Sequence, residues 1–118
     1  MYNNDKNSMI KFERIYNYNG NDYRILIDRM WPRGIKKDRI DLWYKEIAPS
    51  KELVKEYHQT NEFENFKEKY IKELYANGTI VNELIKIIKS KPCVLLYSSK
   101  KEENNSTILK EYLEQKLK

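Results

Sequence analysis

The feature that most constrains the fold of this chain is a short apolar run, Ile25-Leu26-Ile27, that ends abruptly in polar and turn-forming residues. The run continues as Asp28-Arg29-Met30-Trp31-Pro32-Arg33-Gly34. A short apolar segment closed by proline and glycine is typical of a buried strand that enters a loop. We therefore predict a strand over residues 23–28. Because ligands of open α/β sheets bind outside the carboxyl ends of strands, the loop that follows is the predicted functional site.

A second apolar run, Cys93-Val94-Leu95-Leu96-Tyr97, is continuous, as expected for a central strand covered on both faces. Apolar residues between the two runs recur at helical spacing, and another helix is expected after the second run. Helical crossovers imply parallel strands with right-handed connection. If the two strands are neighbours, the loops at 29–37 and 98–105 lie side by side. The predicted helices cover residues 38–47, 50–58, 62–75, 79–88 and a segment beginning at 105 or 106.

The predicted architecture is an α/β fold with Rossmann-like layering, in which helices flank a small, mostly parallel sheet of about three strands or slightly more. Residues 1–8 are polar and are expected to form a loose leader, and residues 9–118 form one domain. A first strand is predicted over residues 10–16. The Asn19-Gly20 pair after it favours a hairpin into residues 23–28, while a parallel arrangement would need a longer crossover. The direction of this first strand stays open.

The composition narrows the classes of ligand, metal and cofactor that this chain is expected to bind. The net charge is +5, and residues 29–39 contain five basic side chains against one acid, which favours an anionic partner; the alternative is a solvated basic loop. One cysteine and one histidine can form neither an intrachain disulfide nor a zinc site of cysteine and histidine ligands. With three glycines and no phosphate-binding glycine motif, we predict no cofactor and no metal. No targeting or membrane-spanning segment is evident, so we expect a cytoplasmic protein.

The leading functional hypothesis is a site for an anionic ligand, bearing phosphate or carboxylate, such as a nucleotide or a nucleic acid. Arginine offers a planar fork of donors that matches such groups, and an indole offers a stacking face. Asp28 would orient one guanidinium. The side chains predicted to bind the ligand are Asp28, Arg29, Trp31, Arg33, Tyr97, Lys100 and Asn105.

Two other hypotheses stay open. In the first, the chain is a small hydrolase or transferase with Asp28 or His58 as acid or base, or with Asp28 paired to Glu102 or Glu103. In the second, it is a structural or partner-binding domain, in which Asp28 pairs with an arginine and Trp31-Pro32 packs on the core. Cys93 opens a buried strand without an activating neighbour, so a reactive thiolate is not expected.

Residues 24–35, Arg24-Ile25-Leu26-Ile27-Asp28-Arg29-Met30-Trp31-Pro32-Arg33-Gly34-Ile35, resemble the signature of the YeaO-like branch of the bacterial domain-of-unknown-function family 488. The resemblance continues, in the same order, through residues 41–50, 52–53, 66–74 and 95–100. It implies a compact α/β domain of the bacterial cytoplasm and supplies no reaction.

This chain departs from the family pattern in the loop after the last strand. Family members often carry an acidic-acidic-His-Asn-His pattern there. The corresponding stretch here is Glu102-Glu103-Asn104-Asn105-Ser106, which retains Asn105 but neither histidine. If those imidazoles do chemistry or bind metal, this chain should lack that chemistry. The departure therefore favours a binding role over a histidine-dependent catalyst.

Overall fold

A computed structural model describes residues 10–101 and 104–118, and its centre is a parallel sheet of four strands in the order β1-β4-β2-β3. All three neighbouring pairs are parallel, so the expected α/β class and parallel sheet are confirmed. The strands are β1 (Lys11–Arg14), β2 (Tyr23–Leu26), β3 (Leu42–Trp43) and β4 (Cys93–Tyr97).

The two apolar runs of the sequence form the centre of this sheet. β2 and β4 pair directly, with Ile25 opposite Leu95 and Leu26 opposite Leu96. All four of these side chains are fully buried. Burial of each aliphatic side chain is worth about 1.5–3 kcal/mol, which explains why strands without alternating polar residues occupy the middle of the sheet. The predicted strands at 23–28 and 93–97 are therefore confirmed as parallel neighbours.

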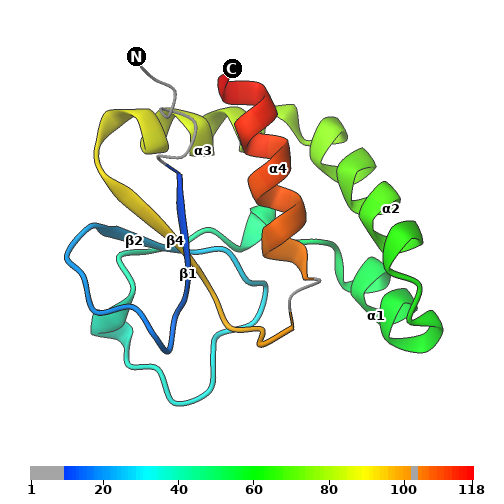
Figure 1. Ribbon diagram of the computed structural model, residues 1–118, viewed down its shortest axis with the longest axis horizontal. Helices are drawn as coiled ribbons and strands as arrows, with labels where there is room; N and C mark the ends of the chain where they lie inside the picture. The colour runs from blue at the N-terminus through cyan, green and yellow to red at the C-terminus, as the bar shows by residue number, and fades with distance from the viewer. Residues whose placement is uncertain (1–9, 102–103) are drawn as a thin grey trace.

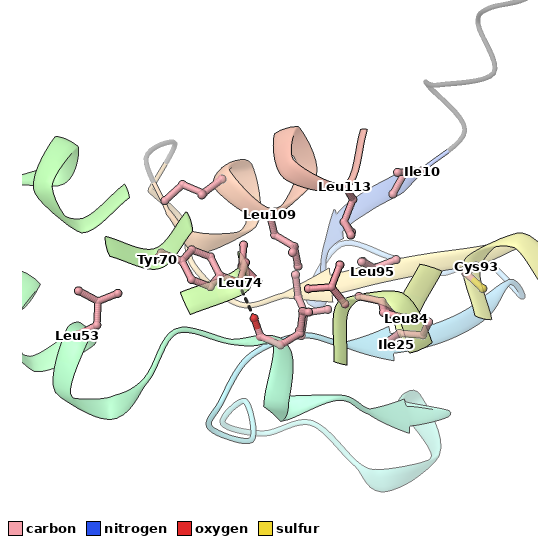
Figure 2. Close-up of a cluster of buried hydrophobic side chains, with 14 of the residues drawn as sticks. Ile10, Ile25, Leu53, Tyr70, Leu74, Leu84, Cys93, Leu95, Leu109 and Leu113 are labelled. Atoms are coloured by element: carbon pink, nitrogen blue, oxygen red, sulfur yellow. Dashed lines mark hydrogen bonds between the residues drawn. The ribbon is translucent and has the colours of Figure 1, made fainter. Parts of the chain in front are cut away.

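The helices pack on one face of the sheet (Figure 1). Their bounds are α1 (Lys51–Thr60), α2 (Phe63–Ala76), α3 (Gly78–Ser90) and α4 (Asn105–Leu117). The main core lies between these helices and the sheet, to which the strand residues Ile25, Cys93 and Leu95 contribute, together with Ile27 just after β2. Figure 2 shows Leu74, Leu84, Leu109 and Leu113 converging there on Ile25 and Leu95.

Loops cover the opposite face of the sheet. Val94 and Leu96 point to that side, where they join Ile15 in a second apolar cluster. The side chains packed against this second cluster are Tyr18, Ile35 and Ile40, all from the connections after β1 and β2. β4 is thus covered on both faces as predicted, but its second face is covered by loops, among the described residues, instead of by a helix.

The predicted helix over residues 38–47 is wrong. This stretch forms a 3₁₀ turn at Lys37–Arg39, the two-residue strand β3, and a second 3₁₀ turn at Lys45–Ile47. Pairing with β2 extends the sheet, with Leu42 opposite Ile25 and Trp43 opposite Leu26. Asp41 precedes β3, and its carboxylate accepts hydrogen bonds from both the guanidinium and the backbone N–H of Arg24. Tertiary pairing outweighs the short helical pattern here.

The local hairpin prediction is also wrong. β1 runs parallel to β4 and lies beside it, so residues 15–22 cross over β4 instead of turning back on β1. Gly20 leaves room for the Tyr18 side chain in this crossover, because a Cβ at position 20 would overlap the Tyr18 hydroxyl. That hydroxyl accepts the backbone N–H of Asp22 at 3.1 Å just before β2.

In the described residues, no helix combines the length and apolarity needed to cross a bilayer.

Candidate functional site

A cavity of about 430 Å³ lies at the carboxyl ends of β2 and β4. Two loops and the start of α4 supply much of its wall, and the segment before α1, α1 itself and α2 supply the rest. The loops predicted to meet, after β2 and after β4, do lie side by side. The lining residues are Asp28, Arg29, Met30, Trp31, Pro32, Arg33, Ala48, Pro49, Val54, Tyr57, His58, Phe66, Ser98, Ser99, Lys101, Asn104 and Asn105.

Asp28 joins the two loops. Its carboxylate accepts the backbone N–H of Ser98 at 2.9 Å and the Ser98 hydroxyl at 2.7 Å, and the Asn105 side chain also bonds to it. Burial raises the pKa of this carboxyl, and the three hydrogen bonds oppose that rise. The expected pairing of Asp28 with an arginine is absent from the described residues, where no ion pair of this carboxylate occurs.

Arg29 and Arg33 differ in their contacts. The Arg29 guanidinium donates from Nε to the carbonyl of Pro49 at 2.9 Å and from Nη2 to that of Ala48 at 3.2 Å. These bonds fasten the β2 loop to the segment that precedes α1. The Arg33 side chain is exposed and has no hydrogen bond or ion pair within the described residues; only its carbonyl is used, by the Tyr16 hydroxyl at 2.8 Å. Gly34 follows with φ +79°, a left-handed turn that favours glycine.

Trp31 is held in place by two contacts. Its indole N–H donates to the Ile35 carbonyl at 2.8 Å, and its ring meets that of Trp43 edge to face, with 5.4 Å between centroids. Trp43 in turn donates its indole N–H to the Asp28 carbonyl at 2.7 Å. The loop is therefore held by side-chain to backbone bonds, and the ring of Trp31 lines the cavity from a fixed position.

The structure brings together most, but not all, of the predicted site residues. Asp28, Arg29, Trp31, Arg33 and Asn105 line the cavity, and so does the candidate acid or base His58, which is exposed on α1. Tyr97 and Lys100 do not line it. The binding role of all these side chains stays a prediction.

Sequence reasoning missed several lining residues. The predicted site does not include Ser98, although a hydroxyl directly after β4 is well placed to meet a carboxylate shortly after β2. Lys101 was passed over in favour of its neighbour Lys100. Tyr57 and Phe66 lie at apolar positions of helical spacing, which are typical of core residues. They stack with 4.6 Å between ring centroids and also form part of the wall. No local signal separates these two roles.

The positions at which the family pattern carries histidines are used to start α4. Asn104 is the N-cap, and its side-chain oxygen accepts the backbone N–H of Ser106 at 2.8 Å and the Ser106 hydroxyl. Both residues are buried. Glu102 and Glu103, the possible partners of Asp28 in a carboxylate pair, lie outside the described residues. Within residues 10–101 and 104–118, no three side chains of the metal-binding types gather in one place.

Residues 9–118 match the family model described as "Inactive DUF488-N3 subclade". The chain belongs to this family. The chain is also similar to the uncharacterised protein YeaO of Escherichia coli (strain K12), to which it is 40% identical over 110 residues, or 88% of this chain and 96% of YeaO. The uncharacterised protein Mb3100c of Mycobacterium bovis is 45% identical over 60 residues, which cover 48% of this chain and 51% of that protein. No solved structure shows a significant match.

Proposed function

We propose that this DUF488-family domain binds an anionic ligand, carrying phosphate or carboxylate, in the cavity between the β2 and β4 loops. The observation that carries the proposal is the exposed Arg33 guanidinium, which has no partner among the described residues and lines a cavity large enough for a small molecule. A guanidinium is always charged and offers donors in a plane that fits phosphate or carboxylate oxygens.

The charges around the cavity support this ligand class. Arg29, Arg33 and Lys101 are basic lining residues, whereas Asp28 is the single acid among the described ones. The carbonyl bonds of Arg29 use two of the five donors of a guanidinium, so others stay available to a ligand. Asp28, which is already bonded to Ser98, offers an acceptor for a hydroxyl or amino group of the same ligand.

Binding accounts for these contacts better than acid–base catalysis does. His58 is exposed, and in the described residues no hydrogen bond orients its imidazole. Asp28 has the raised pKa that catalytic acids often show, but its bonds to Ser98 also give it a structural role. The description of the matching family as an inactive subclade supports the same choice. The structural hypothesis fits Arg29, whose donors meet backbone carbonyls, and leaves Arg33 unexplained.

The test is an NMR titration of the wild-type protein with inorganic phosphate, citrate and a nucleoside monophosphate. Arg33→Gln is the informative variant. Lys89→Gln is its matched control, because Lys89 is exposed at the end of α3, outside the cavity wall, and loses the same charge. We expect shifts at residues 28–34 and 98–105, and affinity lowered about tenfold by Arg33→Gln alone. Absence of shifts with every probe, or equal losses in both variants, would reject the proposal.

A further inference from the structure

A second hollow shares Trp31 with the cavity. It is a groove of about 760 Å³ along the β2–β3 connection. Its walls come from one continuous stretch, so the segment between β2 and β3 borders both the cavity and the groove. The groove is lined by Trp31, Ile35, Lys36, Lys37, Ile40, Asp41, Leu42 and Trp43.

The floor of this groove is aromatic and held in place. Trp31 and Trp43 are the two tryptophans of the chain, and both are only partly buried. Each indole N–H is already bonded to a backbone carbonyl, and the two rings brace each other edge to face. Stacking on a planar ligand requires an aromatic ring that is held in place and reachable from solvent.

The charge around the groove is positive. Lys36 and Lys37 are exposed and, within the described residues, neither side chain has a hydrogen-bond or ion-pair partner. Asp41, the one acid of the wall, is neutralised by Arg24, whose Nε and Nη2 reach its two oxygens at 2.9 and 3.0 Å. The Lys45 ammonium adds a further cation, 4.8 Å from the centroid of the Trp43 ring.

We propose that the groove takes the next nucleotide of a single-stranded nucleic acid, one of whose phosphates occupies the neighbouring cavity; this inference rests on the proposed function. Arg33 and Lys36 are three residues apart, so their Cα atoms are at most about 11 Å from each other, and one short strand can meet both. Bases stack on Trp31 and Trp43, while Lys36 and Lys37 meet the backbone. Aromatic faces interleaved with free cations are the pattern of single-strand binding without sequence preference.

An acidic peptide would meet the same lysines, but it would leave the aromatic surface without a planar partner. The two ligands are therefore separable by the tryptophan signals. Trp43 lines the groove and not the cavity, whereas Trp31 lines both. Because the Trp43 indole N–H is bonded to the carbonyl of Asp28, a cavity residue, the ring C–H signals of Trp43 are the reporter of the groove.

The experiment compares a nucleoside monophosphate, a six-nucleotide single strand of DNA and a six-residue glutamate peptide, by NMR and fluorescence anisotropy. The informative variant is Lys36→Gln/Lys37→Gln. Its control, Lys86→Gln/Lys89→Gln, removes two exposed charges from α3. We expect the hexanucleotide to bind roughly tenfold tighter than the mononucleotide and to shift the Trp43 ring C–H signals. Only Lys36→Gln/Lys37→Gln should remove the extra affinity of the hexanucleotide over the mononucleotide. In that variant, the slope of log affinity against log salt concentration should be smaller in magnitude by about 1.4, because two phosphate contacts are lost.

The outcomes separate this inference from the proposed function. Mononucleotide binding with no gain for the hexanucleotide, or a gain that survives Lys36→Gln/Lys37→Gln, would reject the groove alone. Equal binding of the glutamate peptide with the same Trp43 shift would reject nucleic acid as its occupant. If Arg33→Gln leaves hexanucleotide affinity unchanged while Lys36→Gln/Lys37→Gln lowers it, the cavity holds no phosphate of the strand, and the proposal that one strand spans both sites is rejected. If no probe binds, both are rejected.

Discussion

The Asp28 carboxylate accepts both the backbone N–H and the hydroxyl of Ser98, although 70 residues separate the two along the chain. Each residue follows a central strand of the sheet, Asp28 shortly after β2 and Ser98 directly after β4. The pair therefore links the two loops at the carboxyl edge of the sheet, where both residues line the candidate site. Because burial raises the pKa of this carboxyl, the stability of the fold depends on pH at this position.

The variant Asp28→Asn should become relatively more stable as pH rises. Burial raises the pKa of Asp28 in the folded protein above its unfolded value of about 3.9. The cost of ionising it is absent below the unfolded pKa and fully present above the folded pKa. The free energy of unfolding of the variant minus that of the wild type should therefore increase from pH 4 upward, on top of a constant offset from altered hydrogen bonds. Urea denaturation across that range measures it, with Asp38→Asn as a control. A flat or falling difference would contradict the assignment.

Asp41→Asn should show the opposite dependence. The Arg24 guanidinium holds the pKa of Asp41 below its usual range. Stability from this pair is present above the unfolded pKa of about 3.9 and is lost as pH falls through the lower folded value. Because both side chains are partly exposed, we expect a loss of about 0.5–1 kcal/mol at pH 7 that shrinks on acidification. Chemical denaturation at pH 7 and pH 3 measures it, and a loss that grows in acid would be inconsistent with the pair.

Arg29→Lys and Arg33→Lys should separate a structural arginine from a binding one. A lysine at position 29 cannot bond the Pro49 and Ala48 carbonyls in the same fork, so we expect a loss of about 1.5–3 kcal/mol in the free energy of unfolding. Arg33→Lys should change it by less than about 0.5 kcal/mol, because that side chain is exposed and has no partner in the described residues. The midpoint of urea unfolding measures both. Equal losses would mean that Arg33 also supports the fold.

Ser50→Ala should destabilise the protein by about 0.5–2 kcal/mol. The Ser50 hydroxyl accepts the Leu53 N–H to cap α1, and it donates to Glu73 on α2 at 2.5 Å. Thr79→Ala is the matched control: Thr79 is exposed within α3, and its side chain forms no cap. A double-mutant cycle with Glu73→Gln, followed by thermal unfolding, should show coupling between positions 50 and 73. Additive losses would argue against a shared contact.

The centre of the fold could be predicted from the sequence because its signals are local. Ile25-Leu26-Ile27 and the run at 93–97 have no polar residue on either face, which requires a covered central position. The edges of the sheet could not be predicted in the same way. Leu42 and Trp43 resemble one side of a helix until β2 is available for pairing, and the Asn19-Gly20 turn gives no sign that β4 will lie between β1 and β2.

For the candidate site, too, the location could be predicted from the sequence, whereas the contacts of individual side chains could not. Its location follows from parallel topology, since strand ends share one edge of the sheet, and that placed Asp28 near the loop after β4. The partners of individual side chains do not follow. Arg29 binds the carbonyl of Pro49, 20 residues away, and whether it would meet that carbonyl or Asp28 depends on the path of the chain through β3. Only the folded arrangement decides between such acceptors.

The loops that cover Val94 and Leu96 limit how this protein can diversify. Surface connections usually accept added residues at small cost, and the short turn between α1 and α2, where Asn61 adopts a left-handed conformation, is such a place. The connection between β2 and β3 is different, because Ile35 and Ile40 within it shield the sheet from water. An insertion there would displace that shield. Descendants of this chain can therefore vary the segment by substitution, but its length should stay nearly constant.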